Sequence, residues 1–207
     1  MSEIMRLIVG PYKANCFIFS RGDQAIVIDP GAEEERVIEQ IQSAGLTPLA
    51  VICTHGHIDH IGAVAAVKER FQIPAYIHGA DAALVRRAHL YAAFFKASGR
   101  ITIPQFDGDL RDCAEGLAIG PFAFSVIETP GHSDGGVCLA EGTNIFTGDT
   151  LFAHGHGGTK LPGGNPGKFA TSIAVLAKLD PACTIHPGHG EAARLGDALN
   201  DPRLQDA

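Results

Sequence analysis

The sequence Thr54-His55-Gly56-His57-Ile58-Asp59-His60 places three histidines and one aspartate within seven residues. An apolar run, Leu49–Cys53, precedes this stretch and is predicted to form a buried strand. The segment that follows, Gly62–Phe71, is predicted to be a helix because its apolar residues recur at helical spacing. The polar side chains are therefore expected on one loop that leads from a strand into a helix.

Imidazole and carboxylate groups are the side chains that bind a borderline metal such as Zn²⁺. His55 and His57 are two residues apart, so both project to the same side of an extended segment and can share one ion. Asp59 and His60 begin a turn and point elsewhere, which is what a second ion would require. A histidine-rich surface loop is the simpler explanation of this stretch, but further candidate ligands elsewhere in the chain argue against it.

Those further candidates follow three other predicted strands, and each of them is next to a glycine. They are His132 after Phe122–Glu128, Asp149 after Asn144–Thr147, and His189 after Cys183–His186. Ligands at the carboxyl ends of several strands of one sheet can converge on a single cleft. A lone histidine after a strand is more often structural, but four such loops together favour a metal site.

The remaining elements alternate between strands and helices without a linker, so we expect a single domain over residues 1–207 in the α+β class. The order of strands and helices in the second half resembles that in the first. The other predicted strands are Ile4–Val9, Cys16–Phe19, Ala25–Ile28, Ala75–Ile77 and Val137–Ala140. The other predicted helices are Glu33–Ala44, Ala80–Ser98 and Pro166–Leu179, the last capped by Asn165.

Composition excludes several classes of protein. The chain has 207 residues, 45% of them apolar, and a formal net charge of −7, which argues against a nucleic-acid partner. No apolar run approaches the roughly 18 residues of a membrane span, and no secretory signal is evident at the start. Five scattered cysteines without a Cys-x-x-Cys pair favour a reducing compartment. We therefore expect a cytoplasmic protein with a small-molecule substrate.

Several segments, in order along nearly the whole chain, resemble the metallo-β-lactamase superfamily and in particular its short glyoxalase II-like (hydroxyacylglutathione hydrolase-like) members. The segments are Asn15-Cys16, Asp29-Pro30-Gly31, Thr54–His60, Pro130–Ser133, Gly148–Phe152, Leu161–Gly164 and Pro187–Gly190. The resemblance implies a four-layer αβ/βα sandwich with a metal cleft along one edge. It also implies a hydrolase of small thioesters.

The resemblance further implies two divalent metal ions, with zinc expected and iron or manganese as alternatives. It places one ion on His55, His57 and His132, a second on Asp59, His60 and His189, and Asp149 between the two. Paired ions lower the pKa of a shared water, so a metal-bound hydroxide can attack a carbonyl near neutral pH. Asp59 is the catalytic candidate, as a ligand that orients the hydroxide and carries a proton to the leaving group.

The chain departs from this pattern near the expected substrate. Short relatives often carry Gly-Arg-Thr-Asp where this chain reads Gly157-Gly158-Thr159-Lys160. One cation is lost at Gly158 and another is gained at Lys160, and only 18 residues follow His189, so a helical glutathione-binding domain is not expected. Lys160 and His156 are the candidate substrate-binding residues. His154 is an extra histidine of the same loop, read as exposed or substrate-facing rather than as a ligand.

Other functions remain open. Persulfide dioxygenases of the same superfamily bind one iron through the residues matching His55, His132 and Asp149, and lactone hydrolysis could use the same hydroxide. Gly131–Gly135 matches the G-x-S-x-G elbow of serine hydrolases, but a strand rather than a helix is predicted after Ser133. A metal-stabilised binding protein without catalysis is a further alternative. The chain is expected to be a monomer or a homodimer; Tyr91, Phe94 and Phe95 could serve the dimer.

Overall fold

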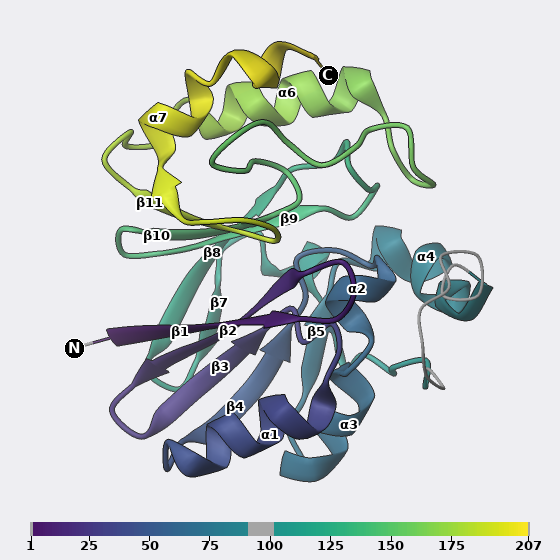
Figure 1. The fold of residues 1–207 in the computed structure, drawn as a ribbon, viewed down its shortest axis with the longest axis vertical. Helices are drawn as coiled ribbons and strands as arrows, with labels where there is room; N and C mark the ends of the chain where they lie inside the picture. The colour runs from purple at the N-terminus through teal and green to yellow at the C-terminus, as the bar shows by residue number, and fades with distance from the viewer. Residues whose placement is uncertain (1, 91–101, 207) are drawn as a thin grey trace.

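Two six-stranded sheets pack face to face in the computed structural model, which describes residues 2–90 and 102–206. The first sheet has the order β1-β2-β3-β4-β5-β6, and the second has the order β12-β11-β10-β9-β8-β7. Helices cover the outer face of each sheet: α1 and α3 lie against the first, and α6 and α7 lie against the second (Figure 1). The fold is therefore the expected α+β sandwich of four layers.

The first sheet is built from the N-terminal half of the chain. Its strands are β1 (Ser2–Val9), β2 (Ala14–Arg21), β3 (Gln24–Ile28), β4 (Thr47–Ile52), β5 (Ala75–Ile77) and β6 (Gly108–Asp109). Strands β1 to β3 are antiparallel, whereas β3 to β6 run parallel. The helices of this half are α1 (Glu34–Ser43), α2 (Ile58–Ile61), α3 (Val64–Phe71) and α4 (Ala82–Arg86), with 3₁₀ turns at Gly79–Asp81 and Leu110–Cys113.

The second sheet follows in the chain. Its strands are β7 (Leu117–Ile119), β8 (Phe122–Glu128), β9 (Val137–Glu141), β10 (Asn144–Gly148), β11 (Thr184–Pro187) and β12 (Ala193–Arg194). Only the β10–β11 pair is parallel. Its helices are α6 (Pro166–Leu176) and α7 (Leu195–Leu199), and a 3₁₀ turn spans Pro202–Asp206. Asn165 caps α6 as expected, because its side chain accepts a hydrogen bond from the N–H of Lys168.

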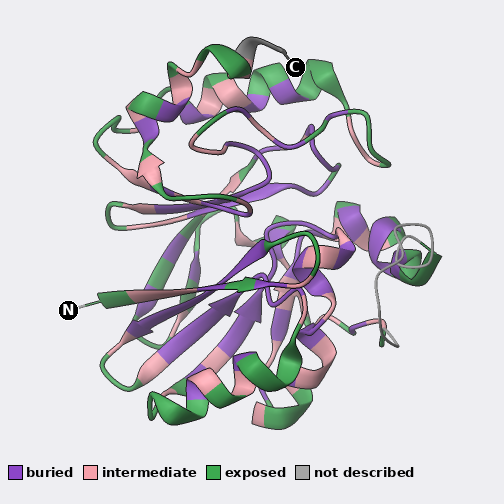
Figure 2. Cartoon of the chain, in the orientation of Figure 1, coloured by how far each residue is buried: buried purple, intermediate pink, exposed green. Residues whose placement is uncertain are grey.

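Figure 2 shows buried residues along the strands of both sheets, and most of the largest fully buried side chains belong to one cluster to which both sheets contribute. Phe19 of β2 is fully buried and packs against Phe122 and Phe146 of the second sheet, with ring centroids 5.2 Å and 5.5 Å apart. Aromatic pairs at this separation add to the gain from burying their area. This core fixes how the two sheets dock, and the loops at one edge of both sheets therefore meet in a reproducible arrangement.

The predicted helix over Ala80–Ser98 is confirmed for most of its described residues, which are helical over 82–86 and 88–90, but it differs at its start and at Arg87. Gly79–Asp81 forms a 3₁₀ turn, α4 ends at Arg86, and a turn at Arg87 separates it from the helical residues 88–90. Within this turn, the carboxylate of Asp81 accepts hydrogen bonds from Gly56 and Gly135, which lie on two other loops. Residues 91–98 of that prediction, with Tyr91, Phe94 and Phe95, lie outside the described residues.

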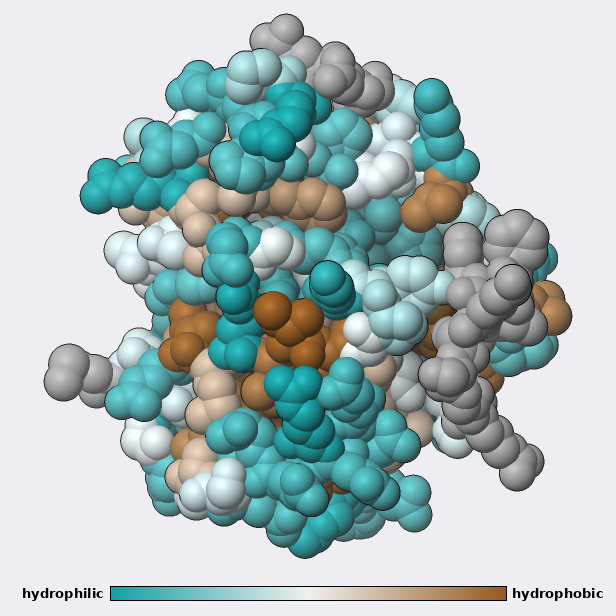
Figure 3. Space-filling model, viewed as in Figure 1, coloured by the Kyte–Doolittle hydropathy of each residue, from teal (hydrophilic) through white to brown (hydrophobic). Residues whose placement is uncertain are grey.

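The face of the molecule shown in Figure 3 is mostly hydrophilic, with apolar side chains confined to small areas. The large apolar side chains that are exposed among the described residues are Ile8, Tyr12, Leu90 and Leu161. No helix in the described part of the chain is long and apolar enough to span a bilayer.

Candidate metal centre

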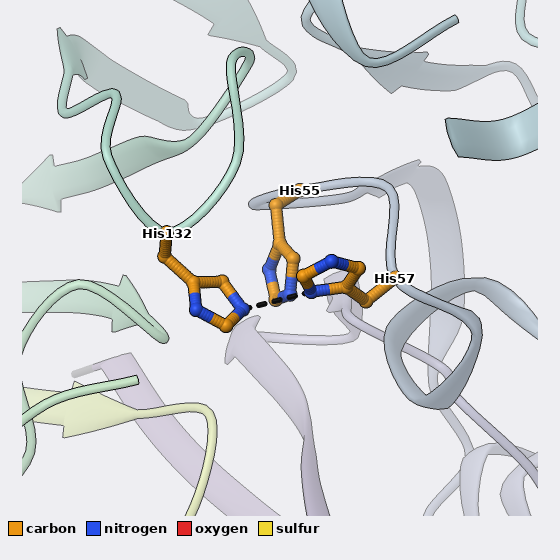
Figure 4. A group of neighbouring side chains, drawn as sticks. All are labelled: His55, His57 and His132. Atoms are coloured by element: carbon orange, nitrogen blue, oxygen red, sulfur yellow. Dashed lines mark hydrogen bonds between the residues drawn. The ribbon is translucent and has the colours of Figure 1, made fainter. Parts of the chain in front are cut away.

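His55, His57 and His132 form one cluster at the edge where the two sheets meet (Figure 4). His55 and His57 come from the segment between β4 and α2, and His132 comes from the loop after β8. The Nδ1 atom of His57 lies 2.8 Å from the Nε2 atom of His132. The ring centroid of His55 lies 4.9 Å from each of the other two. One ligand atom from each residue can therefore reach a common ion.

Asp59, His60 and His189 form the second cluster. Asp59 and His60 lie in the short helix α2, so they belong to a helical turn rather than to the loop itself. His189 follows β11, and its Nε2 atom lies 3.3 Å from Oδ2 of Asp59. The Nε2 atom of His60 lies 3.7 Å from the same carboxylate oxygen.

Asp149 lies between the two clusters. Its Oδ2 atom is 3.4 Å from Nε2 of His132 in the first cluster and 3.6 Å from Nε2 of His189 in the second. Its Oδ1 atom is 3.4 Å from Nε2 of His60. The carboxylate thus faces both groups at once, which is the position that a bridging ligand requires.

Buried atoms without hydrogen-bond partners show that this donor set fits divalent metal. The Nε2 atoms of His55, His57 and His60 and the Oδ1 atom of Asp149 are buried and accept or donate no hydrogen bond. Leaving a buried polar atom unpaired costs about 1–3 kcal/mol, so such atoms are rare unless an ion or a ligand satisfies them. Here they converge within one site, and imidazole with carboxylate is a donor set that suits Zn, Fe or Mn.

In three of these histidines, the Nδ1 atom contacts another group of the protein. Nδ1 of His55 lies 3.1 Å from the hydroxyl of Thr54, and Nδ1 of His132 lies 2.9 Å from the carbonyl oxygen of Gly158. Nδ1 of His60 lies 3.0 Å from Oδ2 of Asp29. Contacts of this kind fix the tautomer and the orientation of metal-binding histidines. They leave Nε2 of each ring as the coordinating atom.

Two buried aspartates outside the predicted ligand set support the site. Asp29, at φ 52°, accepts hydrogen bonds from both the backbone N–H and the hydroxyl of Thr54. Asp81 accepts hydrogen bonds from the N–H of Gly56 and from the N–H of Gly135. It therefore ties the loop that carries His55 and His57 to the loop that carries His132.

Two glycines let the ligand loops pack closely. A Cβ atom at Gly31 would lie 1.5 Å from the carbonyl oxygen of Asp59. A Cβ atom at Gly188 would lie 2.2 Å from Oδ1 of Asp149 and 2.7 Å from Cε1 of His60. Any side chain at either position must displace a predicted ligand, so the site depends on glycine at both positions.

Burial and mutual charge shift the ionisation of the cluster in the metal-free protein. Burial lowers the pKa of His55 well below its ordinary value and lowers that of His132 to about 4. Burial alone would also lower the pKa of His60, but the carboxylates of Asp59 and Asp149 raise it to about 10. Burial alone would raise the pKa of Asp59, but the neighbouring histidines, His60 first, lower it instead. Neutral imidazole is the form that binds a metal, so His55 and His132 are ready to do so.

A cavity of about 350 Å³ opens beside both clusters. Besides the ligand candidates, it is lined by Tyr12, Ile58, Phe152, His156, Gly157, Gly158, Leu161 and Pro162. His156 therefore borders the cavity, with Nδ1 2.6 Å from the carbonyl oxygen of Gly157 and its ring against Phe169. Lys160 is exposed and is not among the lining residues, so a substrate-binding role for it stays a prediction. His154 is exposed and pairs with Asp201 at 2.8 Å.

The structure argues against the serine-hydrolase alternative. Ser133 is fully buried, and its hydroxyl donates a hydrogen bond to Asp81 rather than to a histidine. The strand β9 follows it at Val137, whereas the G-x-S-x-G elbow requires a helix directly after the serine.

Sequence reasoning missed Asp81 and the role of Asp29 in orienting ligands. Asp29 belongs to the family-like segment Asp29-Pro30-Gly31, and the resemblance implies no role for it. A signal for it exists, because Asp29 follows a buried strand, as Asp149 does, and so lies at a strand end where a polar side chain can reach the site. Asp81 lies in a 3₁₀ turn without a motif, so its three hydrogen bonds could not be inferred from spacing.

Known proteins that resemble this chain belong to a family of metal-dependent enzymes, in agreement with a metal site. Residues 9–189 match the family model described as the metallo-beta-lactamase superfamily. The chain is 37% identical over 188 residues to the probable metallo-hydrolase YqgX of Bacillus subtilis (strain 168), with 89% of each chain covered. It is 32% identical over 197 residues to the hydroxyacylglutathione hydrolase GloC of Haemophilus influenzae, with 91% of each chain covered.

Solved structures of the same fold include TTHA1623 in a di-iron-bound form, with a TM-score of 0.86, 34% identity and 96% and 98% of the two chains covered. The BLEG-1 B3 metallo-beta-lactamase gives a TM-score of 0.86 at 32% identity, with 99% of each chain covered. ETHE1 from Myxococcus xanthus gives a TM-score of 0.77 at 24% identity, with 99% of this chain and 85% of that chain covered. A likeness at this identity shows the fold alone. The chain therefore belongs to the metallo-beta-lactamase superfamily of metallo-hydrolases, and its clustered histidines and aspartates imply bound divalent metal.

Proposed function

We propose that the protein is a dinuclear metal-dependent hydrolase of a small thioester, with zinc as the expected metal. The observation that supports this proposal is the convergence of two complete three-residue clusters on Asp149. A mononuclear site needs only one of them. Two relatives described as hydroxyacylglutathione hydrolases add support for a thioester as the substrate class.

His55, His57 and His132 would hold one ion, and Asp59, His60 and His189 would hold the other. Two such ions supply an ionised water as nucleophile near neutral pH and polarise the carbonyl of the substrate. The protein contributes the rest of the chemistry. Asp29, Thr54 and the carbonyl of Gly158 hold the rings in place, so little reorganisation is needed during the reaction.

Asp59 is the proposed catalytic residue. Its side chain is about one-fifth exposed and borders the cavity, so it touches both the second cluster and any bound substrate. The low pKa of its carboxyl keeps it ionised, which suits it to orient the attacking water by accepting a hydrogen bond. The proton would then pass by way of Asp59 to the departing sulfur, because a thiolate is a much stronger base than this carboxylate.

Metal content and turnover test this proposal together. Protein purified without chelator is expected to hold two divalent ions per chain by plasma mass spectrometry and to release thiol from S-lactoylglutathione or simpler thioesters. Asp59→Asn is expected to lower kcat at least a hundredfold. His154→Ala is the matched control, because His154 is 68% exposed and should leave metal content and kcat unchanged.

Other outcomes would replace the proposal. One iron per chain, with oxygen consumed in the presence of glutathione persulfide, would identify a dioxygenase instead. Two ions with turnover of lactones but not of thioesters would identify a lactonase. Full activity and two ions in Asp59→Asn would remove that residue from the mechanism, and metal without any turnover would indicate a binding protein.

A further inference from the structure

The walls of the active-site cavity beyond the ligand candidates are mostly apolar; His156 is the imidazole among them, with its ring against Phe169. Ile58 and Phe152 lie beside the clusters, and Tyr12, Leu161 and Pro162 line the same cavity farther out. Tyr12 and Leu161 are 37% and 41% exposed, which is unusual for large apolar side chains of this protein. Apolar surface gathered in a concave site is typical of ligand pockets, where it takes an apolar part of the ligand.

Positive charge is missing from these walls. Among the described residues, the lining of the cavity includes neither lysine nor arginine. Lys160, on the same loop as His156 and Leu161, is exposed and does not line the cavity. Lys168 pairs with Asp134 at 2.9 Å, so its charge is already engaged at the surface.

When the carbonyl of a thioester lies at the clusters, the groups on either side of it, the thiol part among them, lie against these walls. Glutathione carries two carboxylates, and placing them against apolar walls removes water from charges that find no cation there. An apolar thiol part instead gains by burying its own surface. The walls therefore discriminate by charge, independently of the metal chemistry.

Gly158 is the wall position at which this selectivity can be changed. It borders the cavity, and a Cβ atom built there has Leu161 Cγ as its nearest neighbour, at 3.9 Å. A side chain at residue 158 therefore has room. The carbonyl oxygen of Gly158 holds His132, and a substitution leaves that backbone atom in place.

We propose that the pocket selects thioesters whose thiol part is uncharged and apolar, and that Gly158 is the residue that sets this preference. The proposal rests on the proposed thioester hydrolysis and specifies its substrate class. This preference would distinguish the chain from enzymes that bind a glutathione thioester by pairing its carboxylates with cationic side chains.

The test uses the metal-loaded full chain and three acetyl thioesters that share an acyl group. These are S-acetylglutathione, S-acetyl-N-acetylcysteamine and S-benzyl thioacetate, each normalised to its rate with hydroxide in solution. We expect kcat/KM for the benzyl thioester to exceed that for S-acetylglutathione at least tenfold. An equal or greater kcat/KM for S-acetylglutathione would overturn the proposal.

A pair of variants tests Gly158 itself. Gly158→Arg is expected to raise kcat/KM for S-acetylglutathione five- to tenfold, mainly through KM, with the gain lost at high salt. Gly158→Gln, of similar length without charge, should give no such gain. Equal effects of the two variants, or no effect of either, would exclude Gly158 as the specificity position.

Binding measurements keep this proposal separate from the proposed function. If no thioester is hydrolysed, the proposed function fails, but selectivity can still be read by calorimetry with two unreactive thioethers. N-acetyl-S-benzylcysteamine is expected to bind at least fivefold more tightly than S-benzylglutathione. The reverse order would overturn the proposal whatever the outcome of the activity assay.

Discussion

Among the residues outside the proposed ligand set, Asp81 is expected to lower the free energy of unfolding most when it is substituted. Its carboxylate is fully buried and accepts hydrogen bonds from the N–H of Gly56 at 2.8 Å, the N–H of Gly135 at 2.7 Å and the hydroxyl of Ser133 at 2.8 Å. Asp81→Ala leaves the two backbone N–H groups buried without an acceptor. The serine hydroxyl can rotate toward another acceptor, so it adds little to the loss in free energy of unfolding.

The cost follows from those two groups. Each buried donor without a partner costs about 1–3 kcal/mol, so Asp81→Ala should lower the free energy of unfolding by about 4 kcal/mol. Asp81→Asn keeps one acceptor oxygen but turns an NH₂ group toward a donor, so it should cost about 2 kcal/mol. Since a domain of this kind is stable by about 5–15 kcal/mol, both variants should still fold.

Urea unfolding followed by circular dichroism at 222 nm, on chelator-treated protein, measures these losses. Asp134→Asn is the matched control, because that neighbouring carboxylate is half exposed and pairs only with Lys168. It should cost at most about 0.5 kcal/mol. If Asp81→Ala and Asp134→Asn proved equally stable, the assignment of Asp81 as the tie between the two ligand loops would be refuted.

Three further predictions follow from the same geometry. Ser133→Ala should cost about 1 kcal/mol and leave kcat within twofold, whereas a nucleophilic serine would lose at least a thousandfold. Gly188→Ala should lower metal content and reduce kcat on the order of a hundredfold, because its Cβ atom displaces Asp149. Gly167→Ala should do neither, because a Cβ atom at that helical position makes only an ordinary contact. In metal-free protein, the pKa of His60 is raised to about 10, so its stabilising effect is complete below about pH 6.5 and is lost as the pH rises through 10. The melting temperature of chelated protein should therefore fall between pH 7 and 10, and His60→Gln should remove that fall.

Much of the fold could be predicted because its strands and helices carry strong periodicity. The strand predicted over Phe122–Glu128 is confirmed at both ends, and the start of α6 at Pro166 follows from its cap. The short strands β6, β7 and β12 were not predicted, because two or three residues carry little periodic signal. The helix predicted from Ala80 begins at Ala82 instead, after the 3₁₀ turn in which Asp81 makes its hydrogen bonds to two other loops.

The ligand candidates could be found because each follows a strand end and carries a metal-binding side chain. All seven lie together in the structure, and their assignment as metal ligands stays a prediction. The positions of Lys160 and Gly158 could not be predicted in the same way. Whether a loop side chain borders a cavity depends on how the loop folds back, and glycine-rich sequence leaves that undetermined.

The division of each cluster between the two sheets has a consequence for how the molecule is assembled. Each cluster takes two residues from the segment after β4 and one from a loop of the second sheet. A chain cut near residue 115, ahead of β7, would give two fragments, and neither would hold all three residues of the His55–His57–His132 cluster or of the Asp59–His60–His189 cluster. Uptake of two ions per pair of fragments would then report that the fragments had joined, and added metal would in turn favour their joining over their separation.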